Sequence, residues 1–176
     1  MSNKINEPAL LAVDIADRAR GLASRADALA AKIAALHHDI RAAEGEPVRS
    51  AGFRCNTAAA SMRQAAGELR DTAADLDRIS AASAPGTCSI PWGVCPEHGN
   101  TLVSTAGRTW CRELGCQRRW DHDRVASPCA EAARWTITDQ CGGTSVMCDG
   151  HVLDAARRIQ GSRMAPLVTA ERKEPT

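Results

Sequence analysis

Cysteine and histidine are concentrated in one stretch of this chain. Seven of its eight cysteines and three of its five histidines lie between Cys88 and His151. All four tryptophans follow Pro85, whereas 24 of the 33 alanines precede it. A short, polar segment cannot bury a large apolar core, so a metal ion held by these side chains would supply the missing stability. The distribution predicts a helical N-terminal part packed through small residues and a metal-stabilised C-terminal part.

The first candidate metal site consists of two short-spaced pairs, Cys95 with His98 and Cys111 with Cys116. Structural zinc sites take four thiolate or imidazole ligands, commonly from two such pairs. Residues 101–104 and 108–110 are β-prone and are separated by a turn, which predicts a β-hairpin between the pairs. Because a hairpin reverses the chain, it would carry the second pair back to the first. The sequence therefore predicts a zinc ribbon over residues 92–120.

A second candidate site combines Cys129, Cys148 and His151. Residues 134–138 and 144–147 predict another β-hairpin, and a helix is expected from Cys148 to about Gln160. A hairpin followed by ligands in the first turn of a helix is the order of a treble-clef-like zinc site. We assign this site to residues 122–160.

The second site lacks an obvious fourth ligand. Cys141 falls at the tip of the predicted hairpin, about 15 Å from its base at 3.3 Å per residue. His122 is therefore the preferred fourth ligand, with Cys141, Cys88 and a water molecule as alternatives. The two sites together predict one or two zinc ions per chain.

Disulfide bonds are the competing use for these cysteines. The segment Met1-Ser2-Asn3-Lys4 leads directly into a polar helix start, so we expect no signal peptide. In a reducing cytoplasm, Cys/His pairs at these spacings favour metal over disulfides. No apolar run is long enough to span a membrane, and a formal net charge of +1 gives no excess of positive charge for nucleic acid. We expect a soluble, cytoplasmic protein.

Residues 7–84 have the pattern of two long helices. The first is expected to begin at Asn6-Glu7-Pro8, a favourable helix start, and to run to about Ala43. Its apolar residues recur in alternating steps of three and four, with small or branched residues at heptad a positions and mostly leucine at d positions. The a positions are Ala19, Ala26, Ile33 and Ile40, and the d positions are Leu22, Leu29, Leu36 and Ala43.

A second helix is expected from Asn56 or Thr57 to about Pro85, and the connection before Cys55 is expected to be a loop. Its apolar seam contains Met62, Ala66, Leu69, Ala73 and Leu76. A short loop between two such seams predicts an antiparallel, coiled-coil-like helical hairpin. Because two helices alone bury little surface, we expect a homodimer that forms a four-helix bundle, or a hairpin that docks another protein.

The segment Cys95-Pro96-Glu97-His98-Gly99, followed by Trp110-Cys111 and Cys116, resembles a zinc ribbon in which histidine replaces one cysteine. The segment from Cys129 to Cys148-Asp149-Gly150-His151 resembles the second metal-binding segment of small Cys/His-rich proteins from high-GC bacteria and their mobile elements. The use of 19 arginines against three lysines suits such a source. The resemblance covers residues 88–160 and implies a small cytoplasmic zinc-binding protein without a particular activity or partner.

These observations predict an α+β protein with a helical hairpin over residues 7–84, a zinc module over 88–160 and a disordered tail over 161–176. The preferred function is a non-enzymatic zinc-binding interaction or scaffold protein, because four-ligand sites leave no position for a substrate.

Two other functions compete with this interpretation. A nucleic-acid-binding regulator is the first alternative, since the arginines from Arg108 to Arg134 outnumber the acidic residues in that span by two. The second alternative is a metallohydrolase with Glu131 or His122 as the base. It requires a water molecule as a ligand in the second site.

Overall fold

The computed structural model describes residues 7–42 and 46–167. The chain divides into two compact units, residues 1–80 and 81–176. The first unit is a helical hairpin, and the second contains two small antiparallel sheets and a helix. The predicted α+β class, with a helical N-terminal part and a β-rich C-terminal part, is confirmed.

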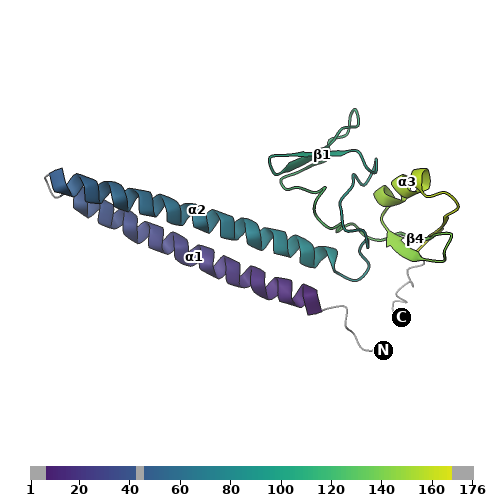
Figure 1. The fold of residues 1–176 in the computed structure, drawn as a ribbon, viewed down its shortest axis with the longest axis horizontal. Coiled ribbons are helices and arrows are strands. Elements are labelled where there is room, and N and C mark those ends of the chain that lie inside the picture. The colour runs from purple at the N-terminus through teal and green to yellow at the C-terminus, as the bar shows by residue number, and fades with distance from the viewer. Residues whose placement is uncertain (1–6, 43–45, 168–176) are drawn as a thin grey trace, which may run out of the picture. The chain divides into compact units, whose positions relative to one another are not determined.

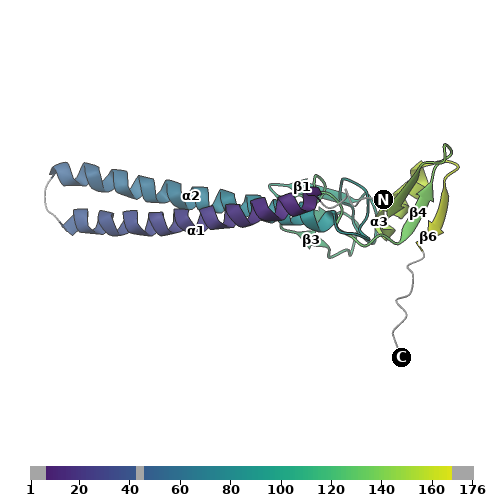
Figure 2. The same cartoon turned by 90° about the horizontal axis from the view of Figure 1, so that it is seen from below.

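The helical hairpin consists of α1 (Glu7–Ala42) and α2 (Glu46–Ala82), which lie side by side and antiparallel (Figures 1 and 2). Small side chains fill the seam between them, as the alanine content predicts. Apart from Gly52, the buried residues among the described side chains of the two helices are all alanines: Ala12, Ala16, Ala19, Ala23, Ala30, Ala59, Ala66 and Ala73. Alanine permits close approach of the helix axes, so the two backbones pack with little side chain between them.

The leucines of α1 do not enter this seam, contrary to their expected role as d positions of the hairpin. Leu22, Leu29 and Leu36 remain 49%, 48% and 52% exposed. Each of these leucines comes three residues after a seam residue, which is Ala19, Ala26 or Ile33, respectively. The leucines therefore lie beside the seam and not in it. The hairpin keeps a row of large apolar side chains on one of its faces.

The second helix begins about ten residues earlier than predicted, at Glu46 instead of Asn56. Gly52 lies inside α2 at a close approach to α1: a Cβ built on it would be 3.4 Å from Cδ2 of His37 and 3.6 Å from Cγ2 of Ile40. The Glu46-Pro47 pair, which was expected to belong to the loop, instead begins α2, because proline is tolerated in the first turn of a helix. Of the predicted loop, residues 43–45 lie outside the described part of the chain.

The second unit contains two three-stranded antiparallel sheets and α3 (Asp149–Arg158). The first sheet has the order β1-β2-β3, with β1 (Leu102–Thr105), β2 (Arg108–Cys111) and β3 (Arg119–Trp120). The second has the order β5-β4-β6, with β4 (Trp135–Thr138), β5 (Thr144–Met147) and β6 (Arg163–Pro166). Both predicted hairpins, β1–β2 and β4–β5, are present.

Strand β6 occupies part of the segment that was predicted to be a disordered tail. It pairs antiparallel with β4, placing Thr136 opposite Ala165 and Ile137 opposite Met164. Met164 packs against the buried cluster around Ile137, which explains why this stretch is ordered. The remainder of the predicted tail, residues 168–176, lies outside the described residues. None of the described helices has the length and apolar character needed to cross a membrane.

The alanine seam makes a test of helix packing. Ala66 is fully buried in it, whereas Ala60 is exposed on the same helix. Ala66→Leu should destabilise the hairpin by about 1–3 kcal/mol because the added side chain forces the helices apart. Ala60→Leu should change stability by less than about 0.5 kcal/mol. Chemical denaturation followed by far-UV circular dichroism measures both, and equal midpoints for the two variants would contradict the seam.

Candidate metal centres

The first candidate centre brings together the four residues predicted for it. The donor atoms of Cys95, His98, Cys111 and Cys116 all lie within 4.8 Å of one another. Nδ1 of His98 is 3.5 Å from Sγ of Cys95 and 3.6 Å from Sγ of Cys111. Sγ of Cys95 is 4.0 Å from Sγ of Cys116.

Two tight turns aim these donors at one point. The backbones of Cys95 and Gly99 exchange two hydrogen bonds of 2.9 Å, and Gly99 takes a φ of +71°, which a residue with a side chain rarely adopts. The hairpin then returns the chain, since Leu102 of β1 pairs with Cys111 of β2. The wider spacing from Cys111 to Cys116 is absorbed by a second turn, in which the Cys116 amide donates to the Glu113 carbonyl at 3.1 Å.

The second candidate centre contains Cys88, Cys129, Cys148 and His151, all of them buried. Nδ1 of His151 is 3.3 Å from Sγ of Cys88 and 3.3 Å from Sγ of Cys148. The sulfurs of Cys129 and Cys148 are 3.8 Å apart. Three of the four residues are those predicted, and the fourth is Cys88 in place of His122.

Cys88 reaches this centre because its segment pairs with the one that carries Cys129. The Cys88 amide donates to the Glu131 carbonyl at 2.9 Å, and the Cys129 amide donates to the Ile90 carbonyl at 3.2 Å. An isolated bridge between Thr87 and Ala132 continues this pairing. The two cysteines are 41 residues apart in sequence, so hairpin spacing alone could not reveal their proximity.

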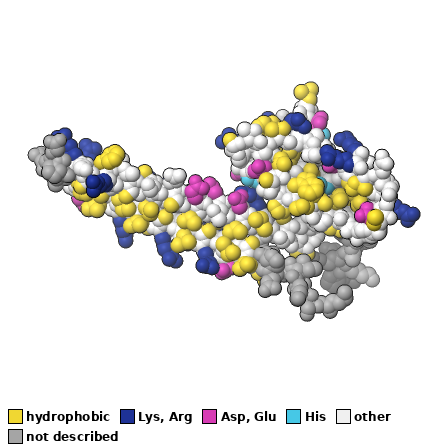
Figure 3. Space-filling model, in the orientation of Figure 1, with side chains coloured by type: hydrophobic (Ala, Val, Ile, Leu, Met, Phe, Trp, Pro, Cys, Tyr) yellow, Lys and Arg dark blue, Asp and Glu magenta, His cyan; other side chains and the backbone are white. Residues whose placement is uncertain are grey.

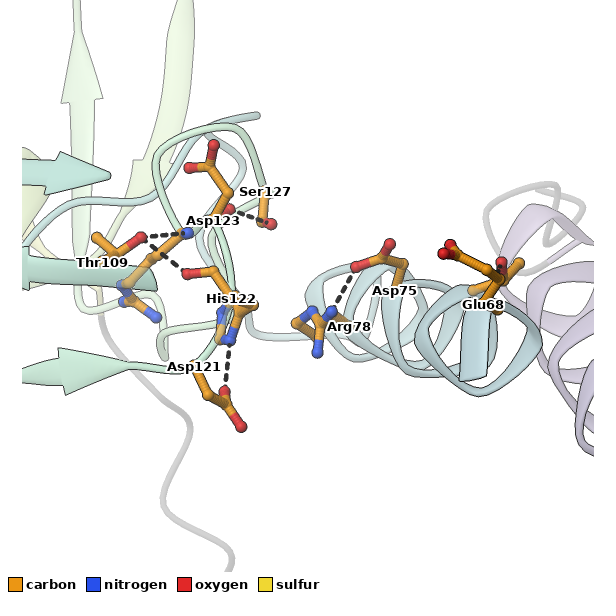
Figure 4. A network of polar contacts seen from close by, with 10 residues as sticks. Glu68, Asp75, Arg78, Thr109, Asp121, His122, Asp123 and Ser127 are labelled. Atoms are coloured by element: carbon orange, nitrogen blue, oxygen red, sulfur yellow. Dashed lines mark hydrogen bonds and ion pairs between the residues drawn. The ribbon is translucent and has the colours of Figure 1, made fainter. Parts of the chain in front are cut away.

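His122 belongs to a different environment. Its backbone carbonyl accepts a hydrogen bond of 2.8 Å from the Thr109 hydroxyl, which ties this segment to β2. Its Nδ1 atom faces the Asp121 carboxylate at 3.1 Å (Figure 4). Cys141, the other alternative, is exposed at the turn between β4 and β5, where its amide bonds to Asp139. The geometry therefore replaces His122 with Cys88 as the fourth donor.

The donor distances fit a tetrahedral metal ion. Bonds of about 2.3 Å to sulfur and about 2.0–2.1 Å to nitrogen place the corners of a tetrahedron about 3.8 Å apart for two sulfurs and about 3.6 Å for sulfur and nitrogen. The observed separations of 3.8 and 4.0 Å, and of 3.3 to 3.6 Å, lie close to these values. All eight cysteines are free, and sulfurs this far apart form no disulfide. Each centre could hold one metal ion.

The clustered thiols compete for protons. In the first centre, burial raises the pKa of Cys95 to about 11. Burial acts in the same direction on Cys111, but hydrogen bonds from the Thr101 hydroxyl, the Glu113 amide and neighbouring thiols lower its pKa to about 7. In the second centre, hydrogen bonds with the other two thiols lower the pKa of Cys88 to about 3, and the same contacts raise the pKa of Cys129. Metal binding displaces the remaining protons, so affinity should rise with pH.

The start of α3 lies against the first centre. Gly150 is buried, and a Cβ on it would overlap the carbonyl oxygen of Cys95 and crowd the Val94 side chain. The same turn of α3 carries His151, a donor of the second centre, and Cys148 is its N-cap. The Cys95 turn and the Cys148–His151 turn therefore pack directly on each other. The sequence does not reveal this role of Gly150, because its contact with Cys95 joins turns that are more than 50 residues apart.

Arg124 connects the same parts through polar contacts and is only 8% exposed. Its Nε donates to the Val94 carbonyl at 3.1 Å, and its Nη2 donates to the Glu131 carboxylate at 2.6 Å. The guanidinium also lies over the Trp120 ring, 4.6 Å from its centroid. A buried charge needs such partners because desolvation is otherwise costly. Arg124 thus joins the first sheet, the Cys95 turn and the segment between Cys129 and β4.

Comparisons of the chain with protein-family models, with curated proteins and with solved structures found no match.

Metal content tests the two centres directly. The protein should contain two metal ions per chain, and Cys88→Ser and Cys95→Ser should each lose the ion of their own centre. His122→Ala is the matched control and should keep both ions, because its ring faces Asp121. Elemental analysis of purified protein makes the measurement. A loss in His122→Ala, or an unchanged content in Cys88→Ser, would contradict the assignment of the fourth donor.

The contact between the centres gives a second test. Gly150→Ala should speed the removal of both ions by a chelator, because the methyl group pushes the start of α3 off the Cys95 turn. Gly67→Ala, a helical glycine with open space around its Cα, should leave the release unchanged. Release is followed with a colorimetric metal indicator. Faster loss of only one ion would show that the two centres are independent.

Proposed function

We propose that this chain is a non-enzymatic zinc-binding interaction protein, in which metal ions hold the C-terminal module rigid and the helical hairpin contacts a partner. The observation that carries the proposal is the pair of Cys3His groups, each with four protein donors at tetrahedral spacing. Four protein donors fill the coordination sphere of zinc, which is typical of a structural ion. The small apolar core of the module gives such ions a clear role.

Zinc is the metal that suits these donors best. Three thiolates and an imidazole in tetrahedral arrangement are typical of zinc, whereas calcium and magnesium prefer oxygen ligands. The chain would acquire these ions in the cytoplasm, where thiols stay reduced.

The same donor sets argue against hydrolysis. A catalytic zinc site keeps one position for water or substrate, and in the second centre that position is taken by Cys88. Glu131, one of the two possible bases, holds an ion pair with Arg124 at 2.6 Å. His122, the other, lies outside the centre.

Nucleic-acid binding is less well supported than protein binding. Of the six arginines between residues 108 and 134, three form ion pairs with acidic residues of the module: Arg118 with Glu97, Arg124 with Glu131 and Arg134 with Asp149. These contacts reduce the positive charge that the run would offer to phosphates. At low salt, the protein should therefore produce no shift in the anisotropy of a labelled DNA or RNA, and a salt-sensitive shift would favour the alternative.

Metal removal tests the structural role. Chelation should abolish the near-UV circular dichroism of the tryptophans, all of which lie in the module, while most of the far-UV helical signal remains. Readdition of zinc should restore the near-UV signal. A module that keeps its tryptophan signal after complete metal removal would contradict a structural role and reopen the question of catalysis.

A further inference from the structure

The hairpin has two unlike faces, one on each side of its alanine seam. On one side, ion pairs cross between the helices, Arg20 with Asp77 at 2.8 Å and Arg70 with Asp27. On the other side, large apolar residues follow three positions after the seam residues in both helices. These rows are Ile15, Leu22, Leu29 and Leu36 in α1, and Met62, Leu69 and Leu76 in α2.

Both rows lie on the same face of the hairpin. The axes of the two antiparallel helices define a plane, and the hairpin has one face on each side of it. A two-fold rotation about an axis perpendicular to this plane exchanges the two helices but does not exchange the two faces. At 100° per residue around each helix, Leu22 lies about 160° from the ion-pairing Arg20, and Leu69 lies about 100° from Arg70. Both rows therefore lie away from the ion pairs, and the α2 row lies nearer the seam. Leu69 and Leu76 are half-buried and pack against the alanines, whereas the α1 row is 38–52% exposed. Figure 3 shows apolar side chains along much of the hairpin.

We infer that this face is covered by a second copy of the chain, so that two hairpins form a four-helix bundle. The inference rests on the proposed interaction role of the hairpin and names its partner. From Leu11, which is 59% exposed, to Leu36 the face is about 38 Å long, at 1.5 Å per residue, and about 15 Å wide across two helices. Each copy therefore offers about 570 Å², at the upper end of the apolar patches of monomeric proteins, and two copies together would bury about 1,100 Å², enough for a small specific interface.

The apolar rows match those of a second copy. In the hairpin, Arg20 lies beside Asp77, and Asp27 lies beside Arg70. A residue of α1 and a residue of α2 are therefore at the same height along the hairpin when their numbers add up to about 97. A two-fold axis along the hairpin preserves these levels and places α1 of one copy on α2 of the other. Leu22 then meets Leu76 of the partner copy, and Leu29 meets the partner's Leu69. Leu36 similarly meets the partner's Met62. Each layer would contain two such pairs, as in the core of a four-helix bundle.

Charges at the edges of the face favour the same arrangement. A basic row on α1, formed by Arg18, Arg25 and Lys32, lies three residues after the apolar row. On α2, Glu68 and Asp75 each precede a leucine of the apolar row and leave the same side of the helix, and Asp75 also forms an ion pair with Arg78 of its own helix (Figure 4). Residue 25 is level with residue 72, so Arg25 would lie between Glu68 and Asp75 of the partner copy. The other two-fold arrangement, with α1 on α1, would bring the basic rows together instead.

Sedimentation equilibrium of the metal-loaded full chain tests the dimer. At about 100 µM protein, the parent should have twice the chain mass of 18.7 kDa. Leu22→Glu/Leu29→Glu should raise the dissociation constant at least about a hundredfold, because it places charges in the apolar layers. Val13→Glu, on the other side of the helix and 42% exposed, is the matched control and should stay dimeric. A monomeric parent, or a double variant as dimeric as the parent, would overturn the inference.

Charge reversal gives a second measurement that does not depend on the folding of the leucine variant. Arg25→Glu should weaken the dimer about tenfold at low salt, and adding Glu68→Arg should restore most of the affinity. Absence of rescue would overturn the α1-on-α2 arrangement. Metal content distinguishes failure of the dimer from failure of the proposed function. A monomer that retains two ions per chain would contradict only the dimer. A chain without metal would contradict the proposed zinc-binding function.

Discussion

The convergence of three thiols and one imidazole in a small, largely buried space is the constraint on which the C-terminal module depends. Without a cation, such a cluster forces protons to be shared unequally, as the opposite pKa shifts of Cys88 and Cys129 indicate. A divalent ion removes the conflict, because every thiol can then be a thiolate. Two turns, two short hairpins and one helix are all arranged to bring donors to two such points. The apolar cluster around Ile137 is too small to specify this arrangement alone.

The turns that form the two candidate metal centres also pack directly against each other. Gly150 allows the first turn of α3 to rest on the Cys95 carbonyl, and Arg124 holds the neighbouring Val94 carbonyl and Glu131. Order at one centre thus limits the positions open to the donors of the other. A module built in this way gains rigidity from contacts between its two donor-bearing turns, and metal ions bound at the two centres would add to it.

The sequence predicted features that depend on local spacing and missed those that depend on distant pairing. The hairpin spacing around Cys95 and Cys111 identified the whole first centre, and the helix start at Cys148 identified half of the second. Cys88 was passed over for His122 because its contact with Cys129 arises from an irregular pairing with no sequence period. The helices were predicted from their heptads, but the same heptads fit two seams. The seam between the helices is formed by alanines because they allow closer packing of the backbones. Leucines such as Leu29 therefore remain outside it.

The ion pairs on the polar face of the hairpin influence how the two helices are aligned along their length. A seam made of alanines every seven residues is almost unchanged if one helix slides by one heptad, so packing alone specifies its alignment poorly. A slip in one direction would bring Arg20 opposite Arg70 and Asp27 opposite Arg63, and a slip in the other would bring Asp27 opposite Asp77. Exposed ion pairs add little to stability. Here the native alignment makes both contacts between opposite charges, whereas each neighbouring alignment contains a contact between like charges, so the charges favour one register.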